Sequence, residues 1–171
     1  MSHKFKTKEI AMKLDRKKHW ETVYETKSPD QVSWTQESPK TSLEFIHSFG
    51  LNKSAKIIDI GGGDSKLVDY LLDEGFENVT VLDISAKSLE QISKYIKTAR
   101  KSVNGFLTIG TFSKNGPEKC SGLEIKQYNE DELTLKLKNG FDKIKCVTED
   151  HLTPFDTTQN FLFCSFKRQL N

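Results

Sequence analysis

Asp59-Ile60-Gly61-Gly62-Gly63-Asp64-Ser65 decides the fold, because an apolar run, Ile57-Ile58, precedes this stretch and a helical pattern, Lys66 to Leu72, follows it. A strand that breaks into glycines and restarts as a helix exposes backbone N–H groups that a cofactor can approach. A dinucleotide fingerprint needs a third glycine where Lys66 stands, and a P-loop needs a Gly-Lys-Ser/Thr ending that is missing here. Asp59 would repel a pyrophosphate and attract a cation. The pattern therefore favours a nucleoside cofactor that bears ammonium and sulfonium groups over a dinucleotide.

This stretch resembles the acid-x-Gly-x-Gly-x-Gly motif of the class I S-adenosylmethionine-dependent methyltransferases, with Ser65 in place of the last glycine. A second predicted strand, Val79 to Leu82, ends in Asp83, where such folds place an acid on the ribose hydroxyls. The resemblance implies S-adenosylmethionine as the cofactor. The predicted cofactor-binding residues are Asp59, Gly61, Gly62, Gly63, Asp83, Ile84 and Trp34. A glycine-rich turn followed by a chance acid is the structural alternative.

The N-terminal part resembles the start of a group of small methyltransferases that begin His-Trp-(Asp/Glu) and continue Ser-Trp-x-Gln. The matching residues are His19-Trp20-Glu21 and Ser33-Trp34-Thr35-Gln36. The resemblance implies that residues 1–40 form a lead-in that lies over the cofactor pocket as part of a lid. Simple aromatic packing is the alternative for the two tryptophans. The C-terminal half resembles the same group at Gly105 to Phe112, Glu149 to Pro154 and Gln159 to Phe161.

The chain departs from this family after Glu90. The family continues there with further strands and helices, whereas this chain runs directly into Gln91 to Val103, which resembles the helix before the family's fifth strand. We therefore expect a segment about the size of a βαβ unit to be absent, either as a true deletion or because this sequence omits it. Apolar residues recur at helical spacing across the junction, which predicts one helix over Ser85 to Val103. We expect the strand from Phe106 to pair beside Ile57 to Ile60, in a sheet of order 2-1-3.

The predicted fold class is α/β, Rossmann-like and three-layered, with a mainly parallel sheet and a C-terminal antiparallel strand pair. Asp142 to Thr148 and Asn160 to Phe166 form that pair across the loop Asp150 to Gln159. Thr41 to Phe49 is predicted as a helix, and Asn129 with Glu132 resembles a capping box that opens another at Glu130.

Composition predicts one compact domain over residues 1–171. The net charge of +2 and a charged fraction of 29% show no strong bias toward nucleic acid. The basic N-terminus is interpreted as a solvated face, with RNA contact as the alternative. No apolar run is long enough to span a membrane and none follows Met1 as in a secretion signal. We therefore expect a cytoplasmic protein without a membrane partner.

Cysteine and histidine positions predict no metal site. Cys120, Cys146 and Cys164 have no Cys-x-x-Cys spacing and are expected to be reduced thiols. Neither do the four histidines show metal-ligand spacing. His151 follows a predicted strand and is interpreted as a surface residue in a turn, with a place in the site as the alternative.

The predicted function is S-adenosylmethionine-dependent methyl transfer, with a protein lysine and a small molecule both open as the acceptor. No catalytic base is predicted, because the family's methyl-transfer loop follows a strand that this sequence lacks. The oligomeric state stays open as well. One alternative is a catalytically impaired module of the same fold that binds cofactor or another protein. Another is a nicotinamide-dependent oxidoreductase, against which Asp59 and Lys66 argue.

Overall fold

The glycine-rich stretch joins two short parallel strands through a helix. In the computed structural model, which describes residues 18–62, 66–82 and 105–169, β1 (Lys56–Ile60) pairs in parallel with β2 (Asn78–Leu82). Between them lies α3 (Leu67–Asp73), and Gly75, with φ of +86°, follows that helix. Glycine adopts this left-handed conformation without steric cost. The predicted strand, glycine turn, helix and second strand are confirmed.

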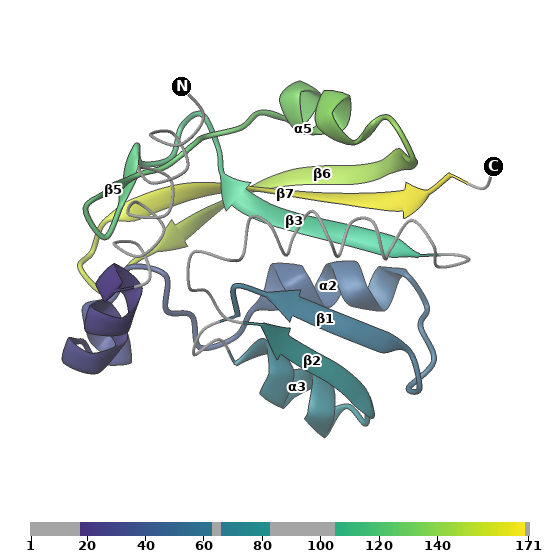
Figure 1. The fold of residues 1–171 in the computed structure, drawn as a ribbon, viewed down its shortest axis with the longest axis horizontal. Coiled ribbons are helices and arrows are strands. Elements are labelled where there is room, and N and C mark those ends of the chain that lie inside the picture. The colour runs from purple at the N-terminus through teal and green to yellow at the C-terminus, as the bar shows by residue number, and fades with distance from the viewer. Residues whose placement is uncertain (1–17, 63–65, 83–104, 170–171) are drawn as a thin grey trace, which may run out of the picture.

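A separate antiparallel sheet forms the C-terminal half (Figure 1). Its strand order is β3-β7-β6, with β3 over Phe106–Phe112, β6 over Phe141–Leu152 and β7 over Thr158–Arg168. The predicted antiparallel pair is therefore confirmed, and both of its strands are longer than expected. Two-residue strands, β4 (Lys119–Cys120) and β5 (Leu123–Glu124), form a small hairpin of their own.

The predicted strand order 2-1-3 is wrong for the described residues. β3 pairs along its whole length with β7, from Phe106 opposite Lys167 to Phe112 opposite Phe161, and it has no ladder with β1. Parallel pairing of named strands is confined to β1 and β2, so the expected mainly parallel sheet is not found either. β7 offers β3 seven consecutive antiparallel partners, and antiparallel pairing is slightly more stable per residue than the parallel pairing expected beside β1. The helix predicted over Ser85 to Val103 lies outside the described residues.

Helix α2 (Lys40–Ser48) packs against both sheets. Its Leu43 shares a core with Leu71 of α3 and Phe76, on the side of the parallel pair. On the side of the antiparallel sheet, Phe49 stacks on Phe106 with 4.3 Å between ring centroids. α2 therefore joins the two sheets although β1 and β3 share no ladder.

The other face of the antiparallel sheet is covered by α5 (Glu130–Leu137), which packs against residues of β6 and β7 and lies beside β6 in Figure 1. The predicted capping box is confirmed, with Asn129 and Glu132 each accepting a hydrogen bond from the other's backbone N–H. Below the helix, a core forms from Leu133, Leu137, Phe141, Leu162, Cys164 and Phe166. None of the described helices is long and apolar enough to cross a lipid bilayer.

Cys146 and Cys164 form a disulfide across β6 and β7, so the expectation of reduced thiols is wrong for these two residues. They are direct partners in the ladder, which brings their side chains to the same face at close range. Cys120 remains a free thiol, and burial raises its pKa.

Candidate functional site

The carboxyl end of β1 carries an acid that is packed onto the glycine turn. Gly61 has a φ of +81°, in the left-handed region that favours glycine. A Cβ atom on Gly62 would lie 2.6 Å from Oδ2 of Asp59 and 3.0 Å from Cγ1 of Val81. A larger residue at position 62 would therefore displace a neighbour, because the Asp59 carboxylate occupies the space next to the Gly62 Cα atom.

Both parallel strands end at the same level. Asp59 pairs with Val81 and Ile60 pairs with Leu82, the last residue of β2. Ligands of open α/β sheets bind just beyond the carboxyl ends of the strands. The structure places three predicted cofactor-binding residues, Asp59, Gly61 and Gly62, at this end of β1. Gly63, Asp83 and Ile84 lie outside the described residues, and Trp34 belongs to the lead-in.

A cavity of about 630 Å³ separates β1 from β3. Five consecutive residues, Lys56 to Ile60, line one side, and Gly105 to Thr108 line the other. Consecutive residues line a cavity where it follows the edge of a strand, since a face of the sheet would present only alternate residues. Ile46 of α2 and Phe49, which directly follows that helix, add apolar lining. The volume lies within the range of about 300–1,000 Å³ typical of small-molecule sites, and Asp59 borders it.

Trp34 packs against aromatic residues of the lead-in. Its ring centroid lies 5.5 Å from that of Trp20 and 6.5 Å from that of Tyr24, both in edge-to-face geometry. Trp20 and Tyr24 belong to a helical stretch over residues 18–26. Trp34 is not among the residues that line the β1–β3 cavity. Its predicted contact with the cofactor stays a prediction.

His151 is buried rather than exposed in a turn, so that expectation is wrong. The residue lies inside β6 and is 7% exposed, because the β6–β7 ladder extends as far as Leu152 and Thr158. Its Nε2 donates a hydrogen bond to the carbonyl oxygen of Ser33 at 2.8 Å, and the Gln36 amide nitrogen lies 3.4 Å from its Nδ1. Strand β6 and the segment before α2 therefore meet at His151, and no local pattern in the sequence indicates this contact.

Comparison with known proteins finds methyltransferases among the proteins that resemble this chain. No protein-family model matches the chain. EEF1A lysine methyltransferase 2 of Mus musculus is 23% identical over 143 residues, which are 77% of this chain and 57% of that protein. The chain thus spans little more than half the length of this curated relative.

Solved structures match over nearly the whole chain. A SAM-dependent methyltransferase from Anabaena variabilis has a TM-score of 0.61 at 12% identity, over 90% of this chain and 93% of that chain. The chain has the class I S-adenosylmethionine-dependent methyltransferase fold. A protein structure reported for the conversion of a disulfide bond into a thioacetal group during echinomycin biosynthesis also matches this chain. Its TM-score is 0.61 at 13% identity, over 91% and 94% of the two chains. The chain is a distant homologue of the mouse methyltransferase.

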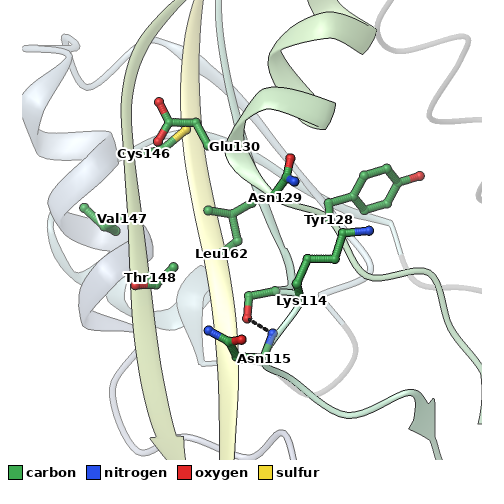
Figure 2. A pocket seen from close by; sticks show the side chains of 10 residues that line it. Lys114, Asn115, Tyr128, Asn129, Glu130, Cys146, Val147, Thr148 and Leu162 are labelled. Carbon is green, nitrogen blue, oxygen red and sulfur yellow. Dashed lines mark hydrogen bonds between the residues drawn. The ribbon is translucent and has the colours of Figure 1, made fainter.

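This methyltransferase fold carries a second, smaller pocket, beside the start of α5 (Figure 2). Its volume is about 310 Å³, and Cys146, Val147 and Leu162 contribute apolar surface. Lys114 at its rim pairs with Glu132 at 3.0 Å. The hydrogen bond from Lys114 lowers the pKa of the Glu132 carboxyl, with the capping hydrogen bond from Asn129 as the next cause. The pocket shares no lining residue with the β1–β3 cavity.

Proposed function

We propose that this chain binds S-adenosylmethionine at the carboxyl end of β1. One observation carries the proposal: the Asp59 carboxylate is packed onto the Gly61-Gly62 turn, at the border of a cavity of about 630 Å³, in a chain with the methyltransferase fold. A carboxylate at this place suits the ammonium group of the cofactor's methionine part. The left-handed turn at Gly61 lets the ligand approach the backbone. Asp83, next in sequence after β2, is proposed to hold the ribose hydroxyls.

The residues present fit such a ligand. The cavity combines an acid at one end with apolar walls from Ile46, Phe49 and Phe106. Bound S-adenosylmethionine would supply a methyl group on a positively charged sulfur, and the protein would supply binding, orientation and exclusion of water. In this chain Asp59 orients the cofactor's amino-acid end, and the apolar walls keep water from the rest.

We further propose methyl transfer to the amine of a protein lysine. This acceptor class is suggested by the name of the mouse relative, EEF1A lysine methyltransferase 2. A catalytically impaired module that binds the cofactor is a second candidate. It is favoured by the separation of β1 from β3, since a cavity lies where neighbouring strands of a sheet would bond.

Calorimetric titration with S-adenosylhomocysteine, S-adenosylmethionine and NAD tests the binding step. We expect both sulfur nucleosides to bind and NAD to fail. Asp59→Asn should weaken S-adenosylhomocysteine binding about 10- to 150-fold, because a charge-assisted hydrogen bond contributes about 1.5 to 3 kcal/mol. Asp69→Asn, at an exposed position in the first turn of α3, is the matched control and should leave the affinity unchanged.

Transfer is measured separately, with radiolabelled S-adenosylmethionine and a lysine-containing protein extract as the acceptor source. Label on protein supports the enzyme. Binding without label under any acceptor condition would support the impaired module. Equal affinity of the Asp59→Asn variant and the wild type would contradict the proposed site.

A further inference from the structure

The buried imidazole of His151 lies between two polar groups of the lead-in. The carbonyl oxygen of Ser33 can only accept a hydrogen bond, and it lies 2.8 Å from Nε2. The amide nitrogen of Gln36 can only donate one, and it lies 3.4 Å from Nδ1. The contact with the Ser33 carbonyl therefore requires a proton on Nε2. Phe161 fixes the ring from the side, with 6.0 Å between the ring centroids and edge-to-face geometry.

His151 is one of three contacts along the same face of β6. Alternate residues of a strand share a face, so Lys145, Glu149 and His151 point to the same side. The Lys145 ammonium lies 5.5 Å from the ring centroid of Phe45 in α2, and the Thr41 hydroxyl donates to the Glu149 carboxylate. His151 comes last in this row and contacts the part of the chain that precedes α2. α2 and the end of the lead-in before it therefore lie along the same face of β6, and His151 holds the lead-in at Ser33 and Gln36.

The segment that His151 holds carries the aromatic cluster. Trp34 directly follows Ser33, and its ring packs on Trp20 and Tyr24 of the stretch over residues 18–26. Figure 1 shows this helical stretch on the side of the molecule toward which β1 and β2 point. The carboxyl ends of parallel strands are the ligand side of an α/β sheet. A group that fixes Ser33 therefore fixes the aromatic cluster on the ligand side.

We infer that His151 is a positioning residue, which holds the lead-in and its aromatic cluster beside the ligand-binding ends of β1 and β2. As far as it concerns ligand affinity, this inference rests on the proposed function. A lead-in that is already ordered costs less conformational entropy when ligand binds, so binding is tighter. The ring contacts of His151 among the described residues are with Ser33, Gln36 and Phe161, so its proposed role acts through the lead-in.

The test replaces His151 in two ways that separate its hydrogen bonds from its packing. His151→Phe keeps a ring against Phe161 and removes both hydrogen bonds, whereas His151→Gln keeps an N–H near the place of Nε2 for the Ser33 carbonyl. The chain has two tryptophans, Trp20 and Trp34, and both lie in the cluster. Tryptophan emission therefore reports on the lead-in. Tryptic cleavage after the exposed Lys27 gives a second report that needs no ligand.

In His151→Phe we expect red-shifted emission, faster cleavage after Lys27 and about tenfold weaker binding of S-adenosylhomocysteine, because a buried carbonyl loses its donor. His151→Gln should restore all three readouts to within about threefold of wild type. His47→Phe is the control and should change none of the three readouts. It replaces an exposed histidine of α2 whose ring pairs with Glu74 at the end of α3. Gln36→Leu removes the second hydrogen bond from the lead-in side, and it should shift emission and cleavage in the same direction even where His151→Phe fails to fold.

Wild-type emission, cleavage and affinity in folded His151→Phe would overturn the positioning role. So would a His151→Gln variant that behaves as His151→Phe does, since packing would then be the whole effect. If the wild-type protein binds no S-adenosylhomocysteine, the proposed function fails, and emission and cleavage alone decide whether His151 holds the lead-in.

Discussion

Replacing Gly62 by alanine tests whether the glycine turn and the Asp59 carboxylate work as one unit. The added Cβ would lie 2.6 Å from Asp59 Oδ2 and 3.0 Å from Val81 Cγ1. Carbon and oxygen atoms do not approach this closely without a bond, so one group has to move. Val81 lies within the β1–β2 ladder and is held by its backbone pairing, whereas the Asp59 carboxylate ends a short side chain. The carboxylate is therefore expected to move, by several tenths of an ångström.

This displacement should weaken ligand binding as well as lower the stability of the fold. Overpacking at one position costs about 1 to 3 kcal/mol of stability. Loss of the charge-assisted hydrogen bond from Asp59 should cost about 1.5 to 3 kcal/mol of binding energy, or about 10- to 150-fold in affinity. Stability is measured by urea denaturation and affinity by calorimetric titration with S-adenosylhomocysteine.

Gly122→Ala is the matched control. Gly122 has a φ of +79°, and a Cβ placed there would meet no atom within 4 Å. The control should lose about 1 to 2 kcal/mol of stability from the left-handed backbone and keep its affinity. If Gly62→Ala binds S-adenosylhomocysteine as tightly as wild type while Asp59→Asn does not, the proposed link between the turn and the carboxylate is refuted.

Three further predictions follow from the cores and from the charged helix start. Leu71→Ala should cost about 2 to 5 kcal/mol, because Leu71 is 0% exposed, whereas Leu72→Ala at the 52% exposed neighbouring position should stay within about half a kcal/mol; comparison by urea denaturation checks both. Thiol titration in denaturant should find the Cys120 thiol alone before reduction and all three of the chain's thiols after it, and reduction should destabilise the protein by about 3 kcal/mol because the disulfide closes a loop with a separation of 18 residues. The pKa of Glu132 is lowered in the folded state, so its stabilising effect is complete above its ordinary pKa of 4.5 and is lost as the pH falls through the folded-state value; Glu132→Gln should flatten the acid limb of a stability-against-pH curve, and an unchanged acid limb would contradict the assignment.

Local patterns predicted the elements of this fold well, because each depends on neighbouring residues. The capping box needs only Asn129 and Glu132, three residues apart, and both of its hydrogen bonds are present. The turn after β1 needs glycine for its left-handed backbone, which the stretch from Asp59 supplies. Strand order depends on which distant segment competes best for an edge. β3 pairs with β7, whose first residue, Thr158, lies far along the chain, and no pattern within β3 itself indicates this choice.

In the candidate site, too, residues within one segment were predicted and contacts between distant segments were missed. Spacing alone placed Asp59 and Gly61 at the end of a strand, where the structure has them. His151 was misjudged because its partners, Ser33 and Gln36, are 118 and 115 residues away in sequence. The Cys146–Cys164 disulfide was missed for a related reason, since it depends on the register of β6 against β7. Sequence spacing reveals a site that one segment builds, and it does not reveal contacts that arise between segments.

The two sheets are joined by a helix, and this helix determines how far apart the parts of the proposed site lie. Asp59 belongs to the parallel pair and His151 belongs to the antiparallel sheet, and these sheets share no ladder among the described residues. α2 contacts one sheet through Leu43 and the other through Phe45, and Phe49, directly after the helix, also packs on the antiparallel sheet. The lead-in continues directly into α2, and its far end is bound by His151. A shift of α2 would therefore move the wall of the β1–β3 cavity and the aromatic cluster together. Packing of this one helix, rather than a continuous sheet, sets the distance between the cofactor-binding end of β1 and the lead-in.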